Sequence, residues 1–299
     1  MIWIVGANGM LGREVSEILK HYFSSILTTD MDLDITNYED VRNFVVEKKP
    51  SWIINCAAYT TVDKAESEPD AAFALNVSGP ANLARAGRII SARLISISTD
   101  YVYGSVVNGK NRADPLLEND NTSPQSVYGK TKLQGELGIA SETDQFFILR
   151  TAWLYGQYGK NFVSTMLRLF KEQNIIKVVD DQIGCPTWTH DLAELIAAII
   201  LKDSNAYGTY HFCGDGRTSW YSFAEKIAEI SFQMGLINKV PEIIPCKSID
   251  FPTPAKRPLW SVLSTQKVKD TFQISIPSWK ESLAEYLKQV LEINNEKKT

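Results

Sequence analysis

The chain has 299 residues, of which 44% are hydrophobic, and its formal net charge is -4 at pH 7. This length suits two domains or one large α/β domain with a substantial core. Lys and Arg are interspersed with acidic residues, which argues against a nucleic-acid surface, and no stretch approaches the ~20 apolar residues of a membrane span. The N-terminal apolar run is too short for a signal peptide, so we expect a cytoplasmic protein.

The cysteines do not indicate a metal centre. Four cysteines lie far apart in the sequence without a Cys-x-x-Cys pair, and the chain has only three histidines. Metal sites built from these residues need closely spaced ligands. We therefore expect reduced thiols and predict no metal ligands.

A glycine-rich turn follows the first apolar run. Ile2 to Val5 reads as a buried strand, and Gly6, Gly9 and Gly12 lead into a segment with helical apolar spacing. Glycines at such a turn permit a tight bend, close approach of a pyrophosphate and close packing of helix on strand. The spacing departs from Gly-x-Gly-x-x-Gly, and a plain strand-to-helix turn is the alternative. Its place at the start of an α/β pattern favours a dinucleotide site.

Acidic residues follow the second predicted strand, Ser25 to Thr29. Asp30 lies about twenty residues beyond the glycine turn, where a carboxylate would bind the adenosine ribose. Asp32 and Asp34 would repel a 2′-phosphate and no arginine accompanies them, so the sequence favours NADH over NADPH. A solvated acidic loop is the alternative. Asn37 is predicted to cap a helix that continues through Lys48.

Two further strands alternate with helices. The predicted elements are a strand over residues 52–58, a helix from Pro69 to Arg88 and a strand from Arg93 to Ser98. In an open parallel sheet, ligands lie beyond the carboxyl ends of the strands, so Thr99 is expected near the cofactor. Residues 104–124, rich in Gly, Asn, Asp and Pro, read as a loop that could form a flap over the site.

Tyr128 and Lys132 are spaced for one face of the next predicted helix. A neighbouring ammonium favours the phenolate and would bring the tyrosine pKa closer to neutrality, which suits proton transfer to a carbonyl oxygen. For this pair alone, a surface helix on which Tyr and Lys merely pack side by side is the more common case.

The remainder of the chain alternates less regularly. Trp153 follows a strand at 146–150 and either fills the core or stacks on a ligand ring. The further predicted elements are helices at Phe162–Glu172, Asp191–Leu201, Trp220–Met234 and Trp279–Ile293 and strands at Ile175–Val179 and Tyr207–Cys213. The expected fold is α/β, a Rossmann-type doubly wound parallel sheet with a smaller α/β carboxyl-terminal domain. We expect residues 1–155 and about 175–203 to bind the dinucleotide, and 156–174 and 204–299 to form the second domain.

The ordered motifs resemble the extended short-chain dehydrogenase/reductase family and, within it, the dTDP-4-dehydrorhamnose reductases. The segments that carry the closer resemblance are Asn55–Glu66, Ser98–Tyr103, Val127–Lys132, Arg150–Tyr155, Asp181–Thr187 and Pro252–Pro258. They spread over nearly the whole chain. The resemblance implies reduction of the 4-keto group of dTDP-4-dehydro-L-rhamnose with NADH or NADPH, and a dTDP-sugar as the ligand of the second domain.

The same resemblance implies roles for individual residues. Tyr128 would deliver a proton to the keto oxygen, Lys132 would hold the nicotinamide ribose, and Thr99 would bond the substrate oxygen. The implied cofactor contacts are Gly9, Met10 and Leu11 at the diphosphate, Asp30 at the ribose, Asp34 with Ile35 at the adenine, and Ala57, Ala58 and Tyr59 along the cofactor. Asp100 and Trp153 would face the sugar nucleotide, which decides the alternatives for Trp153 in favour of binding. A homodimer and a magnesium ion are left open, since neither is readable from the sequence.

Three related functions compete with this reading. A 4,6-dehydratase needs a carboxylate just after Thr99 and Asp100, where this chain has Tyr101. A 4-epimerase could use the same Tyr128 and Lys132. A non-catalytic regulatory subunit, similar to that of methionine adenosyltransferase, would be expected to lose this pair, whereas both residues are present.

Overall fold

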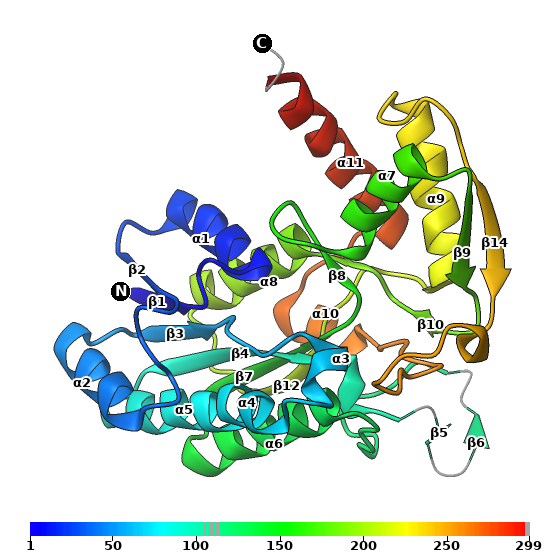
Figure 1. Ribbon diagram of the computed structural model, residues 1–299. Coiled ribbons are helices and arrows are strands. Elements are labelled where there is room, and N and C mark those ends of the chain that lie inside the picture. Colours follow the sequence, from blue (N-terminus) through cyan, green and yellow to red (C-terminus); the bar gives the residue numbers. More distant parts are fainter. Residues whose placement is uncertain (105, 108–109, 112–113, 297–299) are drawn as a thin grey trace.

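A six-stranded parallel sheet forms the centre of the molecule (Figure 1). The computed structural model describes residues 1–104, 106–107, 110–111 and 114–296. In spatial order, the strands are β12 (Gly208–His211), β7 (Phe146–Thr151), β4 (Arg93–Thr99), β3 (Trp52–Asn55), β1 (Ile2–Val5) and β2 (Ile26–Thr29). Each neighbouring pair is parallel, with Ile2 opposite both Ile26 and Trp52.

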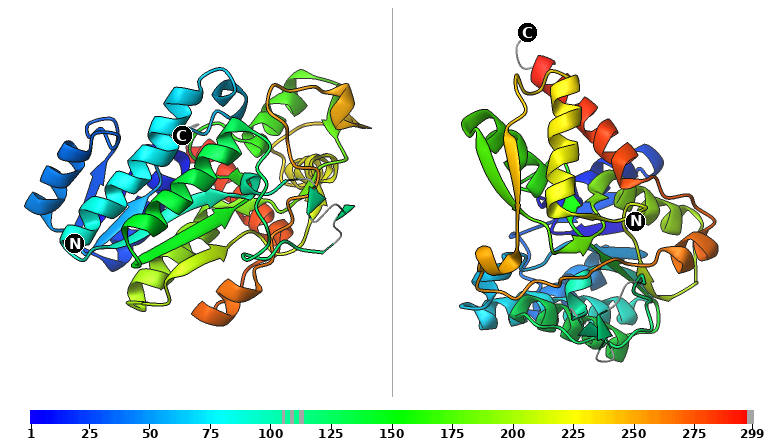
Figure 2. Two further views of the ribbon diagram at one scale, coloured as in Figure 1. Left: turned by 90° about the horizontal axis from the view of Figure 1, so that it is seen from below. Right: turned by 90° about the vertical axis from the view of Figure 1, so that its right-hand side faces the viewer.

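Helices cover both faces of the sheet, which confirms the expected doubly wound fold. Helices α1 (Met10–Tyr22) and α8 (Thr189–Leu201) lie on one face, and α2 (Tyr38–Lys48), α5 (Gly79–Ile89) and α6 (Val127–Glu142) lie side by side across the other (Figure 2). Successive residues of β1 point into opposite cores, Ile2 and Ile4 toward α1 and α8, Trp3 and Val5 toward α5. A strand buried on both faces is apolar throughout, which explains the run Ile2–Val5.

The side of the sheet to which the chain adds its next strand changes at β1. The chain leaves β1 for β2 on one side and then returns to form β3 on the other side. Connections that leave in opposite directions open a crevice beyond the carboxyl ends of the strands. The structure therefore places the glycine turn, which follows β1, at this switch point.

A second core lies beside the sheet. Its elements are α7 (Phe162–Glu172), β9 (Ile175–Val179), α9 (Trp220–Gln233), β14 (Glu242–Cys246) and α11 (Trp279–Glu296), at the upper right of Figure 1. Parallel pairing joins β9 to β14. The sequence reading grouped β9 with the dinucleotide-binding part, whereas Ile176 and Val178 of β9 pack in this second core.

Several short elements complete the described fold. They are α3 (Val62–Ala65), η2 (Asp100–Val102), η3 (Ser248–Asp250), α10 (Gln266–Phe272) and the pairs β8 (Leu154–Tyr155) with β11 (Thr187–Trp188), β10 (Ile183–Gly184) with β13 (Thr218–Ser219), and β5 (Val106–Val107) with β6 (Lys110–Asn111). The last pair falls in the segment expected to be a loop. Residues 105, 108–109 and 112–113 of the expected flap lie outside the described residues.

The helix predicted from Pro69 to Arg88 is present and extends to Ile89, but its middle is π-helical. The segment forms α4 (Pro69–Phe73), a π-helical turn η1 (Ala74–Ser78) and then α5. The Asn76 side chain accepts from Tyr59 N at 2.8 Å and donates to Thr131 Oγ1 at 3.1 Å. A Cβ on Gly135 would lie 2.1 Å from the Asn76 carbonyl oxygen, so only glycine lets this wide turn press against α6.

Other predicted boundaries differ by a few residues. The strand predicted from Tyr207 to Cys213 is limited to Gly208–His211, and the helix predicted from Asp191 begins at Thr189. Asn37 caps α2 as predicted, its side chain accepting from Glu39 N. Within the described ranges, we find no helix with the length and apolar character needed to cross a bilayer.

Candidate active site at the carboxyl edge of the sheet

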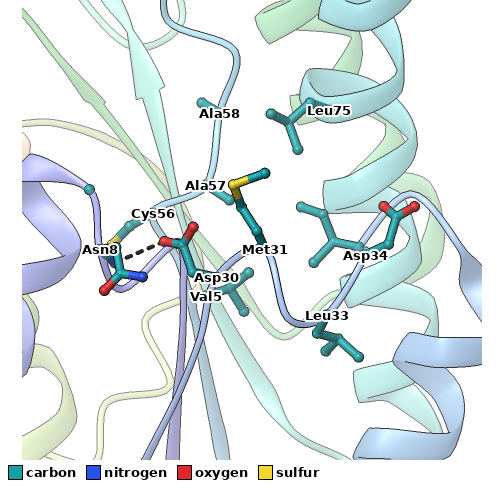
Figure 3. Close-up of a pocket in the computed structure, with 13 residues that line it drawn as sticks. Val5, Asn8, Asp30, Met31, Leu33, Asp34, Cys56, Ala57, Ala58 and Leu75 are labelled. Carbon is teal, nitrogen blue, oxygen red and sulfur yellow. Dashed lines mark hydrogen bonds between the residues drawn. The ribbon is translucent and has the colours of Figure 1, made fainter.

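A cavity of about 680 Å³ lies at the switch point (Figure 3). Its lining combines the ends of β1, β2 and β3 with the turns that follow: Val5, Gly6, Asn8, Gly9, Asp30, Met31, Leu33, Asp34, Ile35, Cys56, Ala57, Ala58 and Leu75. The structure thus brings together most residues predicted to hold the adenosine half of a dinucleotide. Gly6 and Gly9 line this cavity, as do Ala57 and Ala58.

Two glycines of the turn stand where no side chain would fit. Gly6 has φ +72°, and a Cβ there would lie 2.6 Å from Ala57 N. A Cβ on Gly12 would lie 2.1 Å from the Gly6 carbonyl oxygen, so Gly12 permits the close packing of α1 on the turn. Gly9 occupies the N-cap of α1 without a side-chain cap, which leaves the first-turn N–H groups to an anion. This cradle fits a dinucleotide diphosphate.

Asp30 is fixed in the cavity. Its Oδ2 accepts a hydrogen bond from Asn8 N at 2.8 Å, drawn as the dashed line in Figure 3. Asp34 also lines the cavity, while its Oδ1 accepts from Thr36 N at 2.9 Å. Two carboxylates at the ribose end give this cavity an acidic rim.

A second cavity, of about 450 Å³, continues from the first. Gly9, Cys56, Ala57 and Ala58 line both. The remaining lining of the second comprises Met10, Leu11, Thr60, Val62, Ile97, Ser98, Thr99, Asp100, Tyr101, Tyr128, Lys132, Thr151, Ala152, Trp153, Leu154, Lys160, Trp220 and Arg257. All residues predicted to react with or bind the substrate, Thr99, Asp100, Tyr128, Lys132 and Trp153, therefore meet in one cavity.

Tyr128 lies in the first turn of α6, beside Thr99 at the end of β4. The Ser126 side chain caps the helix by accepting from Gly129 N at 3.1 Å. Burial raises the pKa of Tyr128 above its ordinary value, and a hydrogen bond with Thr99 opposes this rise. The phenol therefore holds its proton at neutral pH, as a proton donor requires.

Lys132 lies on the same side of α6 but is directed at the backbone of β4. Its Nζ donates to the Ile97 carbonyl at 2.7 Å, and burial lowers its pKa to about 8. The sequence led us to expect that Lys132 lowers the pKa of Tyr128. The groups that act on the Tyr128 pKa are instead Thr99, Asp100 and Tyr101.

Asp100 is a buried carboxyl in the same cavity. Its Oδ1 accepts from the Thr99 hydroxyl at 3.0 Å, whereas its Oδ2 has no hydrogen-bond partner among the described residues. Burial raises the pKa of Asp100 to about 6, and hydrogen bonds from Ser261 and Thr99 oppose this rise. An unpartnered buried oxygen in a cavity is suited to accept from a ligand hydroxyl.

Trp153 is held between two neighbours. Trp220 stacks on its ring, with 3.6 Å between centroids and 8° between planes. A Cβ on Gly184 would lie 2.5 Å from Trp153 Cε2. Trp153 has φ 48°, a strained backbone conformation for a non-glycine residue, of the kind that clusters at functional sites. The clamped ring is part of the cavity wall.

Tyr59 and Gly12 do not line either of these two cavities. The Tyr59 hydroxyl donates to Glu68 Oε2 at 2.6 Å, and its backbone is bound to Asn76. The contact with the cofactor that the resemblance implied for Tyr59 stays a prediction, and the bond to Glu68 directs the Tyr59 side chain elsewhere.

The sequence reasoning assigned no role to several residues that line the two cavities, among them Asn8, Lys160, Trp220 and Arg257. Arg257 and Trp220 line the second cavity and also a third, apolar cavity of about 660 Å³. Arg257 donates to Asp63 Oδ2 at 2.8 Å and to the Tyr101 hydroxyl at 3.3 Å. The only signal for Arg257 was its place in the proline-rich segment Pro252–Pro258, and Trp220 merely begins a helix.

Comparisons with known proteins agree with this geometry. The family model described as RmlD substrate binding domain matches residues 1–292. A dTDP-4-dehydrorhamnose reductase of Aggregatibacter actinomycetemcomitans is 39% identical, over 94% of this chain and 96% of that protein. The enzyme of that name from Streptomyces griseus is 40% identical, over 95% and 92%.

Solved structures give the same result. A dTDP-4-dehydrorhamnose reductase from Clostridium acetobutylicum has a TM-score of 0.89 at 44% identity, covering 97% of this chain and 99% of that one. Another from Bacillus anthracis, in complex with NADP, has a TM-score of 0.88 at 39% identity, covering 96% and 98%. The chain therefore belongs to the dTDP-4-dehydrorhamnose reductase family.

Proposed function

We propose that this protein reduces the 4-keto group of dTDP-4-dehydro-L-rhamnose to give dTDP-L-rhamnose, with NADH or NADPH as the reductant. The observation that carries the proposal is the convergence of Thr99, Tyr128 and Lys132 in a cavity that continues into the glycine-turn cavity. When bound, the reduced nicotinamide supplies a hydride to C4. Tyr128 transfers its hydroxyl proton to the keto oxygen, so one hydride and one proton complete the alcohol.

Each residue contributes to this step through its position. Thr99 lies within hydrogen-bond reach of Tyr128 and orients the keto oxygen toward the phenol. Lys132 holds the nicotinamide ribose, and the hydrogen bond with Thr99 is the interaction that lowers the Tyr128 pKa and so favours release of the proton. The part around the central sheet binds the cofactor, and the second core, to which β9 belongs, lies on the side that binds the sugar nucleotide, with Asp100 and Trp153 at the junction.

The first test measures NADH and NADPH oxidation by the purified protein with the keto sugar. Wild-type protein should consume the reductant continuously, whereas Tyr128→Phe should lose about 10²–10⁴-fold in kcat because it lacks the transferable proton. Binding of NADH to the variant, measured by fluorescence, controls for its fold. No oxidation by the wild type contradicts the function; a fully active variant contradicts the role of Tyr128. Epimerisation without net consumption would identify a 4-epimerase.

The second test concerns the cofactor. We propose that Asp30 favours NADH, because a fixed carboxylate accepts from the ribose 2′-hydroxyl and repels a 2′-phosphate. Asp30→Ser should lower the ratio of kcat/KM for NADH to that for NADPH by about tenfold or more, a change of about 1.4 kcal/mol. Asp40→Ser, which removes an exposed carboxylate of α2 that lines neither cavity, is the matched control. An unchanged ratio in Asp30→Ser would contradict the preference.

A further inference from the structure

A buried ion pair lies one helical turn beyond Lys132. Glu136 is only 6% exposed and receives Arg150 Nε at 3.0 Å on Oε1 and Arg150 Nη2 at 2.6 Å on Oε2. The Ser98 hydroxyl also donates to Glu136 Oε1. The carboxylate is thus held by Ser98 of β4 and by Arg150 of β7. The two parallel hydrogen bonds from the guanidinium make this a bidentate ion pair, which is stronger than a typical surface pair.

A small cavity of about 10 Å³ separates this carboxylate from Lys132. Its lining includes Lys132 and Glu136 from α6 and the side chains or backbone of Asn76, Ser96 and Ser98. This volume is close to what a single water needs, and the mixed lining offers it polar partners in Asn76, Ser96, Ser98, Lys132 and Glu136 beside apolar side chains such as Ile139 and Ile148. The Lys132 ammonium has three donors, one of which is used by the Ile97 carbonyl, so it can donate across the cavity.

The charges around Lys132 single out Glu136. The titratable groups that line the two cavities beside it are Tyr128 and Glu136 from α6, Cys56 after β3, Asp100 and Tyr101 after β4, and Lys160 and Arg257. Arg150 is the ion-pair partner of Glu136 and lines neither cavity. Glu136 and Cys56 are the two that raise the Lys132 pKa. Burial raises the pKa of Cys56 to about 12, so this thiol is uncharged at working pH. Glu136 therefore supplies the negative charge that acts on Lys132.

We propose that Glu136 is a positioning residue of the reaction, whose carboxylate, fixed by Arg150 and Ser98, keeps the Lys132 ammonium charged and directed along β4 across the small cavity. The proposal rests on the proposed function, because it matters to catalysis only if Lys132 holds the nicotinamide ribose. A lysine buried in this way loses its proton easily. The Glu136 carboxylate, one helical turn away, raises the pH at which Lys132 loses its proton.

The test is the pH profile of kcat/KM between pH 6 and 10 for wild type and Glu136→Gln. Removal of the carboxylate should move the alkaline limb down by about one pH unit, since Lys132 then deprotonates sooner. Glu136→Asp, which keeps the charge on a shorter side chain, should restore the limb toward the wild-type position even if kcat is reduced. A purely structural role would lower activity without moving the limb.

Two further measurements test the role of Glu136 if the Glu136→Gln variant does not fold or if no turnover is observed. If Glu136→Gln does not fold, the double variant Glu136→Gln/Arg150→Met removes both buried charges together, and its limb should move in the same direction by less. NADH affinity across the same pH range, followed by fluorescence, tests Lys132 without any turnover. A wild type that binds NADH but reduces nothing would defeat the proposed function alone. Unshifted kinetic and binding profiles in a folded Glu136 variant would overturn the role of Glu136.

Discussion

At the scale of single residues, burial shifts the pKa values of two ionisable groups in the site away from their ordinary values. Lys132 titrates with a pKa of about 8, and Asp100 with a pKa of about 6. Both shifts oppose the charged form and therefore disfavour folding at neutral pH. Such groups are tolerated where a ligand compensates for them, which is consistent with their place in the cavity.

Lys132→Met should stabilise the protein in the absence of cofactor. The folded pKa of Lys132 lies below the unfolded value of 10.5, so its contribution to stability is full above pH 10.5 and is lost as the pH falls through about 8. At pH 7, the variant should gain about 1–2 kcal/mol in free energy of unfolding, after loss of the bond to Ile97. Urea denaturation at pH 7 and pH 10.5 checks this. A variant less stable than wild type at pH 7 would contradict it.

At the scale of elements, most strands and helices could be predicted from their own sequence. The spans Phe162–Glu172 and Ile175–Val179 are those that apolar spacing indicated. The π-turn at Ala74–Ser78 could not be predicted, because its cause is the contact of Asn76 with Tyr59 and Thr131 from other segments. The strand β14 was missed because it contains Pro245, which an edge strand tolerates.

The site was predictable to the extent that topology assembles it. Asp30 and Thr99 end parallel strands, and all such ends meet at one edge of the sheet. For the carboxyl-terminal half, no such rule of sheet topology predicts which residues reach the site, because this part of the chain packs in a separate core. Trp220 and Arg257 arrive by that route, and no local pattern marks them as ligand-lining residues.

The close approach of β10 to Trp153 predicts a selective effect of Gly184→Ala. The added Cβ would lie 2.5 Å from Trp153 Cε2. It would push the indole toward Trp220 and into the second cavity, which holds the sugar nucleotide in the proposed function. The KM for the keto sugar should rise by about tenfold, with a loss of stability of about 1–3 kcal/mol and little change in NADH affinity. Gly138→Ala on α6, where the Cβ meets Ala81 at 3.3 Å, is the control. Equal effects on sugar and NADH would contradict this prediction.

At the scale of the whole molecule, His211 joins distant segments. Its Nε2 and the Tyr103 hydroxyl are 2.8 Å apart, and its Nδ1 lies 3.1 Å from the Leu116 carbonyl oxygen. Tyr103 in turn accepts from Arg150 Nη1 at 2.6 Å. Burial and the Arg150 charge lower the pKa of His211 to about 3, so the imidazole is neutral in the folded protein. The outermost strand β12 is thereby tied to the segment after η2.

This network predicts acid sensitivity. The folded pKa of His211 lies below the unfolded value of 6.5, so its contribution is full above pH 6.5 and is lost as the pH falls toward 3. Between pH 6.5 and 4.5, the wild type should lose about 2 kcal/mol relative to His211→Gln, which cannot titrate there. The comparison cancels the opposite contribution of Asp100. Parallel urea-unfolding profiles for the two proteins over this range would refute the assignment.

The four residues common to both cavities, Gly9, Cys56, Ala57 and Ala58, have an energetic consequence. A dinucleotide resting on them becomes part of the wall that the sugar nucleotide contacts. The two ligands are then thermodynamically linked, and reciprocity requires that each change the affinity of the other by the same factor. Because these four residues belong to both cavities, the fold itself couples the binding of the reductant to the binding of the substrate.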